Sequence, residues 1–182
     1  MTVSTIDRRQ ALALLAASSA ALTARLSHAA APGTEPTAQH THVTTALAAY
    51  IAGSGTAAIP ATHRELARQH ILDTLASIVA CRDLEPAVVA RKFAIASSGS
   101  VTSNAATILG TRERCALSDA VFASAMTAHS AEINDFIPSA FVQPGPAIVS
   151  AALALAETRG RSGEAILRAV VVGYELAGRI PS

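Results

Sequence analysis

Alanine dominates this sequence: it supplies 42 of the 182 residues, whereas Phe, Trp and Tyr together make up only 3%. Alanine has the highest intrinsic helix propensity, and β-sheets favour aromatic and β-branched side chains. The composition therefore excludes an all-β fold and predicts packed helices. The hydrophobic content of 51% and the formal net charge of +1 also exclude a chain that is mostly disordered. The length is sufficient for one domain with its own core.

The charge and the cysteine count exclude further classes of protein. Nucleic-acid binding needs a concentrated basic surface, and a net charge of +1 does not provide one. Two cysteines, Cys81 and Cys115, are too few for a disulfide scaffold. We expect them to be buried apolar side chains in a helical core. The sequence leaves open whether they pair.

The N-terminal 30 residues have the pattern of an export signal. Arg8 and Arg9 precede an apolar run over 11–22, and a stretch of small residues follows at 27–31. This order is typical of a secretory signal, and adjacent arginines indicate the twin-arginine route, so we expect a periplasmic protein. An amphipathic helix or an uncleaved anchor is the alternative. The run of about a dozen residues is shorter than the roughly 20 that span a bilayer, so no stable membrane span is expected after signal removal.

Three segments follow from this pattern: a twin-arginine-type signal peptide over 1–30, a linker over 31–43 and a helical domain over 44–182. Hydrophobic residues in the domain recur at steps of three and four, as on the apolar face of a helix. Prolines suit the first turn of a helix, and serine is a favoured N-cap. The expected helices begin at Thr44, Pro60, Pro86, Ser118, Pro146 and Ser162. Residues 106–110 are apolar and end in glycine, which favours an extended segment.

A polar segment separates the helices expected at Ser118 and Pro146. Prolines at 138, 144 and 146 prevent a continuous helix there. Rigid elements that hold a polar loop are the usual arrangement for a binding or catalytic site. The candidate residues in this loop are His129, Glu132, Asn134, Asp135, Ser139 and Gln143.

Glu132 and Asp135 are the strongest candidates for acid–base chemistry. On a helix they would share a face, and mutual repulsion would suit one of them to hold a proton. The alternative is a solvated helix end with a capping Asn or Asp. His129 is either a base or a capping residue. The sequence has no zinc-site spacing, nucleophile elbow, phosphate-binding loop or dinucleotide fingerprint, so we expect no metal and no cofactor.

Five segments, in the right order, resemble the signature segments of the MmgE/PrpD family, which includes 2-methylcitrate dehydratase, cis-aconitate decarboxylase and iminodisuccinate epimerase. Thr107–Thr111 resembles the family's T-V-L-G-T, and the loop ends in a Pro-Gly like that of H-P-G. The segments are 66–76, 107–111, 119–129, 144–157 and 173–179. The resemblance implies an all-α domain and a hydro-lyase of the 2-methylcitrate dehydratase type. Such an enzyme removes a proton next to a carboxylate of a small di- or tricarboxylate.

We assign catalytic roles to Asp135, Glu132 and His129, and substrate contacts to Asn134, Ser139 and Gln143. The family carries D-F-D-D-T in this loop and a histidine before Pro-Gly. Here Glu132 replaces the first Asp, Asn134-Asp135 replaces the Asp pair, and Phe136 stands at the Thr. Gln143 replaces the histidine, and a glutamine can bind a substrate but cannot carry a proton.

Members of the family are more than twice as long and add a smaller α/β domain. We therefore expect a truncated, incomplete enzyme fragment that lacks that domain. Its partner would be a missing C-terminal half or a second copy in a dimer. The alternative is a non-catalytic helical module for oligomerisation or interaction. A carboxylate-binding protein is disfavoured because it needs two lobes.

Overall fold

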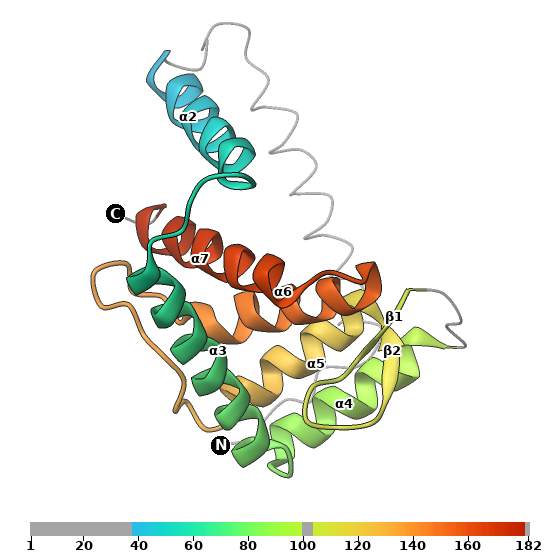
Figure 1. The fold of residues 1–182 in the computed structure, drawn as a ribbon. Helices are drawn as coiled ribbons and strands as arrows, with labels where there is room; N and C mark the ends of the chain where they lie inside the picture. Colours follow the sequence, from blue (N-terminus) through green and yellow to red (C-terminus); the bar gives the residue numbers. More distant parts are fainter. Residues whose placement is uncertain (1–37, 100–103, 181–182) are drawn as a thin grey trace, which may run out of the picture. The chain divides into compact units, whose positions relative to one another are not determined.

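The computed structural model describes residues 38–99 and 104–180, with side chains from residue 43 onward (Figure 1). The signal peptide expected over 1–30 lies outside the described residues. The chain divides into two compact units, 1–49 and 50–182, and the core described below belongs to the second. None of the helices in the described ranges is long and apolar enough to cross a membrane.

Helices make up most of the described residues, so the prediction of an all-α fold is confirmed. The helices are α2 (Ala38–Ser54), α3 (Ala61–Cys81), α4 (Glu85–Ser98), α5 (Leu117–His129), α6 (Pro144–Arg159) and α7 (Gly163–Arg179). Two short strands, β1 (Ala105–Thr107) and β2 (Arg114–Ala116), form an antiparallel hairpin between α4 and α5. The hairpin takes up only the start of the extended segment expected over 106–110.

The sequence signals for helix ends were right in part. Ser162 caps α7 as predicted, since its Oγ accepts a hydrogen bond from the Ala165 N–H at 3.4 Å. Gly160 ends α6 in the left-handed region, at φ 57° and ψ 41°. Ser118 is not a cap: α5 begins at Leu117, and Ala116 is the N-cap. The reason is that β2 runs directly into α5, so the last residue of the strand already has the extended ψ of 145° that an N-cap needs.

Three other helices begin earlier than expected, and one of them, α4, does so by a single residue, at Glu85 rather than Pro86. The helix α2 starts at Ala38 rather than Thr44, inside the segment 31–43 that we expected to be a linker. The helix α6 starts at Pro144 rather than Pro146, so both prolines lie in its first turn. A proline is tolerated there because the first-turn N–H groups have no partner within the helix.

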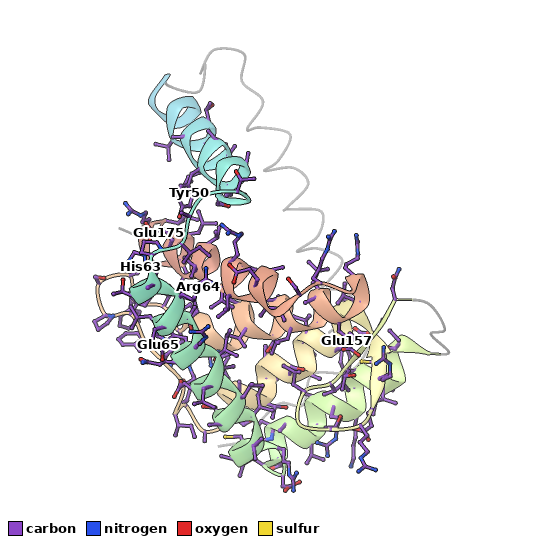
Figure 2. The ribbon with its side chains drawn as sticks, viewed as in Figure 1. Tyr50, His63, Arg64, Glu65, Glu157 and Glu175 are labelled. Atoms are coloured by element: carbon purple, nitrogen blue, oxygen red, sulfur yellow. The ribbon has the colours of Figure 1, made fainter. Side chains whose placement is uncertain are left out.

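Glu157 of α6 fastens the hairpin to the helices (Figure 2). Its carboxylate accepts hydrogen bonds from the N–H and the hydroxyl of Thr107, each at 2.8 Å, and from the Arg114 guanidinium. Burial opposes ionisation of Glu157, but these hydrogen bonds and the Arg114 charge outweigh it and hold the pKa of Glu157 below its ordinary value.

Alanine builds much of the core, as the composition predicts. One cluster, between α4, the hairpin, α5 and α6, consists of Ala94, Ala106, Ile108, Cys115, Ala120, Ala123 and Ala154. A second, between α3, α6 and α7, contains Ala67, Val149 and Val170. Side chains this small let helices approach closely at interior packing density. Cys81 and Cys115 are buried free thiols in the described structure.

The segment 130–143 joins α5 to α6 and passes alongside α3 (Figure 1). We refer to it as the α5–α6 loop. It contains one isolated β-bridge, between Ile137 and Val142. Glu132 and Phe141 adopt positive φ values of 53° and 54°, which mark the two bends of the loop. This path brings the loop to the core cluster of α3, α6 and α7.

Candidate functional site

Asp135 is the best-anchored polar side chain of the α5–α6 loop. Its Oδ1 accepts a hydrogen bond from the Gly145 N–H at 3.0 Å, and its Oδ2 accepts one from the Tyr174 hydroxyl at 2.6 Å. His70 Nδ1 lies 3.5 Å from the same Oδ2. Only 11% of the Asp135 side chain is exposed. The carboxylate therefore links the loop to three helices, α3, α6 and α7.

The sequence around Gly145 explains why Asp135 binds at that point. Pro144 and Pro146 have no N–H, so Gly145 supplies the one donor among the first three residues of α6. A carboxylate at a helix N-terminus also interacts favourably with the helix dipole. The Pro-Gly-Pro start of α6 therefore directs Asp135 to a single N–H.

Gly145 itself is required by close packing. A Cβ at this position would lie 2.5 Å from Asp135 Oδ1, 2.7 Å from Thr74 Oγ1 and 2.9 Å from the Tyr174 hydroxyl. Real Cβ contacts are longer than this, so any side chain would displace the polar cluster. The glycine allows Asp135, Thr74 and Tyr174 to meet over the start of α6.

Buried polar atoms without partners lie in and beside this cluster. Thr74 Oγ1 and Asn134 Oδ1 are buried and have no hydrogen-bond partner in the described structure. The Asn134 amide donates to the Asp135 carbonyl oxygen at 3.3 Å. Unsatisfied buried polar groups are rare in folded proteins and often occur at functional sites. They add to the polar character of the interior around Asp135.

Tyr174 connects Asp135 to His70. Burial, the hydrogen bond to Asp135 and the negative charges of Asp135 and Asp73 raise the pKa of Tyr174 well above its ordinary value of 10.0. The phenol therefore remains a hydrogen-bond donor to the carboxylate. Its ring packs against the His70 imidazole, with ring centroids 4.4 Å apart and planes inclined by 33°.

A pocket of about 180 Å³ opens between α3 and α7 next to these rings. Its lining residues are His63, Leu66, Ala67, His70, Val170, Val171, Tyr174 and Glu175. Figure 2 labels His63 near the start of α3 and Glu175 in the last part of α7. Asp135 is not one of the lining residues. It contacts His70 and Tyr174, which are two of the polar residues of the pocket wall.

The other predicted site residues lie elsewhere. Glu132, with 69% of its side chain exposed, accepts a hydrogen bond from Gln143 Nε2 at 3.0 Å, and His129 Nδ1 is 4.0 Å from its Oε1. Ser139 is exposed. The structure thus brings Glu132, His129 and Gln143 together at the exposed side of the loop, and it brings Asp135 to the buried side.

Sequence reasoning missed His70, Thr74 and Tyr174. Helical spacing places His70 and Tyr174 with apolar neighbours; Tyr174 packs against the apolar core, and its ring contacts that of His70. A signal was present, because these residues lie within two of the segments, 66–76 and 173–179, that resemble family signatures. A polar side chain inside such a segment is a candidate for the site.

In the ranges that the structure describes, no group of three or more His, Cys, Asp or Glu residues is arranged to hold a metal ion.

In the comparison with protein families, the MmgE/PrpD N-terminal domain matches residues 45–182. The match includes every residue of the pocket and of the α5–α6 loop. Comparisons with curated proteins and with solved structures gave no match.

Proposed function

The chain belongs to the MmgE/PrpD family through its N-terminal domain, and from this premise we propose that it takes part in lyase chemistry on small di- or tricarboxylates. The proposed reaction is a dehydration of the 2-methylcitrate dehydratase type at the pocket between α3 and α7. The observation that carries the proposal is the largely buried Asp135 carboxylate, which contacts Gly145, Tyr174 and His70, two of which line that pocket.

This arrangement suits the removal of a proton next to a substrate carboxylate. Such a step needs an acid–base group that is held in place within reach of the substrate. Asp135 and His70 form a connected pair of ionisable groups, and His70 lines the pocket. Tyr174 packs on His70 and donates to Asp135, which restricts the movement of both.

The residues that depart from the family pattern are not members of the Asp135–His70 pair. Gln143, which replaces a family histidine, lies with Glu132 at the exposed side of the loop. Phe136 replaces a family threonine, and its ring packs edge-on against Phe141, with centroids 5.5 Å apart. The proposal assigns proton transfer to neither residue.

The test is a dehydration assay on the purified chain. The wild type is incubated with 2-methylcitrate, and formation of the alkene product is followed by its ultraviolet absorbance. The matched variants are D135N and E65Q, since Glu65 is an exposed carboxylate on the same helix as His70 and pairs with Arg68 and Gln69. We expect D135N to lose about 100-fold or more in rate and E65Q to keep the wild-type rate.

A wild-type chain without detectable turnover would contradict this proposal. Circular dichroism melting of D135N separates a catalytic effect from unfolding. A loss of rate in E65Q equal to that in D135N would show that the carboxylate at 135 has no special role.

A second candidate is the non-catalytic helical module that oligomerises. It is favoured by large hydrophobic side chains on the surface of the second unit, which include Leu72, Val79, Phe93, Ile133 and Phe141. Exposed apolar patches commonly mark interaction surfaces. Sedimentation of the same wild-type sample tests this function: a dimer without turnover supports it, and an active monomer excludes it.

The N-terminal pattern supports export to the periplasm as part of the same proposal. Fusion of residues 1–37 to a reporter tests it. We expect periplasmic reporter, and loss of export when Arg8 and Arg9 are both replaced by lysine. Cytoplasmic retention of the unmodified fusion would contradict the export proposal.

A further inference from the structure

We propose that His70 is the catalytic residue that carries the proton in this pocket, and that Asp135 is a positioning residue that acts through it. The inference rests on the proposed function and deepens it.

The surroundings of Asp135 exclude it as the group that meets the substrate. One of its oxygens is held by Gly145 and the other by Tyr174, and His70 approaches the second. The carboxylate is also behind the pocket wall rather than in it. A base must reach the proton that it removes, directly or through one water. In this structure His70 and Tyr174 stand between Asp135 and the pocket.

Tyr174 also lines the pocket, but its hydroxyl proton is already donated in a hydrogen bond to Asp135. The hydroxyl donates to Oδ2 at 2.6 Å, and the raised pKa keeps the phenol neutral. A neutral phenol whose only proton is already donated cannot take up a proton from a substrate. The role of Tyr174 is therefore to hold the carboxylate and to pack against the imidazole plane.

The remaining ionisable groups of the pocket are less well placed than His70. Glu175 is held by the guanidinium of Arg179 one turn further along α7. His63 is exposed at the start of α3. His70 has 37% of its side chain exposed, so it is partly enclosed while still open to the pocket.

The orientation of His70 leaves one nitrogen for the ligand. Its Nδ1 lies 3.5 Å from Asp135 Oδ2, and Nε2 is the other ring nitrogen. A carboxylate next to Nδ1 favours the tautomer with the proton on that nitrogen, so that Nε2 keeps its lone pair. Contacts between catalytic groups are often long without a ligand and shorten to hydrogen bonds in the complex.

In the proposed reaction, His70 removes a proton from carbon and returns the same proton to the leaving hydroxyl. Nε2 takes the proton from the carbon next to a substrate carboxylate. The electron pair of that C–H bond forms the new C=C bond as the C–O bond to the hydroxyl breaks. The imidazolium gives the same proton to the departing hydroxyl, so that water leaves and His70 is neutral again. The Asp135 charge stabilises the imidazolium between the two transfers.

Nuclear magnetic resonance of the ¹⁵N-histidine-labelled chain tests the geometry without turnover. We expect His70 to be protonated on Nδ1 in the wild type and to lose that preference in D135N. Citrate serves as the probe ligand, and it should shift the Nε2 resonance of His70 but leave that of His129 unchanged. A His70 protonated on Nε2, no effect of D135N, or no shift with citrate would each overturn the inference.

Kinetics test the chemical role. In H70Q we expect kcat to fall about 100-fold or more, with KM within threefold of the wild type. Added imidazole should restore part of the rate to H70A, which a purely structural role would not allow. The control is Q69A, on the exposed side of α3, because Gln69 contacts only Glu65 among the hydrogen bonds of the described residues. Full activity in H70Q would overturn the inference and leave the proposed function intact.

The two proposals fail in different ways. Absence of turnover in the wild-type chain contradicts the proposed function, while the tautomer and the citrate titration still decide whether Asp135 orients His70 toward the pocket. An active wild type with an unaffected H70Q contradicts only the role of His70.

Discussion

Asp135 and Glu132 are three residues apart in the same loop, yet the structure gives them opposite environments. The Asp135 side chain is 11% exposed and is fixed by donors from α6 and α7. The Glu132 side chain is 69% exposed, and its partner is the half-buried Gln143. Within three residues, the loop thus carries one largely buried carboxylate that accepts two hydrogen bonds, Asp135, and one solvated carboxylate, Glu132.

The difference shows that residue type and spacing do not determine the chemical role of a carboxylate. Glu132 follows the end of α5 at a bend with φ of 53°, which directs it outward. Asp135 meets the first turn of α6, where Gly145 supplies an N–H and no side chain. The helix that receives the loop, rather than the loop itself, distinguishes the two carboxylates.

The largest expected effect comes from removal of the buried carboxylate. Asp135→Ala leaves the Gly145 N–H and the Tyr174 hydroxyl without their acceptor. Each orphaned buried donor costs roughly 1–3 kcal/mol, so we expect the free energy of unfolding to fall by about 3 kcal/mol. Urea denaturation measures it. A loss below about 1 kcal/mol would show that water replaces the carboxylate and that the site is open.

A methyl group added at Gly145 should cause the next largest loss in the free energy of unfolding. Gly145→Ala places a Cβ within 3 Å of Asp135, Thr74 and Tyr174, and overpacking of this kind costs about 2 kcal/mol. The control is Gly163→Ala at the start of α7, where no atom lies within 4 Å of the new Cβ. We expect that substitution to be neutral or to stabilise by up to about 1 kcal/mol. Equal losses in both variants would contradict the packing described for Gly145.

Alkaline pH should lower the free energy of unfolding gradually, through the ionisation of Tyr174 next to Asp135. The pKa of Tyr174 is raised in the folded state, so above its ordinary value of 10.0 unfolding releases the phenol proton. The unfolded state then binds fewer protons than the folded state, and stability falls as the pH rises. Tyr174→Phe removes this contribution. Thermal melting from pH 8 to 11 should show a smaller decline for the variant, and equal declines would contradict the raised pKa.

The smallest effect is expected on the exposed side. Glu132→Ala removes one solvated hydrogen bond to Gln143, and surface substitutions of this kind change stability by no more than about 0.5 kcal/mol. Urea denaturation next to Asp135→Ala gives the contrast directly. A loss as large as that of Asp135→Ala would show that the two carboxylates belong to one cooperative site, as their spacing first suggested.

Part of the site could be predicted from the sequence. The prolines and the polar residues marked the α5–α6 loop and included Asp135 among the candidates. His70 and Tyr174 were not identified, because helical spacing places them with apolar neighbours and nothing local shows which buried group they meet. Tyr174 and Asp135 are 39 residues apart, and such a contact depends on how α7 packs against α6.

The sequence by itself determined the helices of this protein and its family. Alanine content, periodic apolar residues and first-turn prolines act within a few residues of each other, so they can be interpreted without the fold. Only the tertiary structure decided that Asp135 is largely buried while Glu132 is exposed, and that His70 and Tyr174 line the same pocket. Burial and hydrogen bonding between helices depend on the packing of distant segments, which no local pattern specifies.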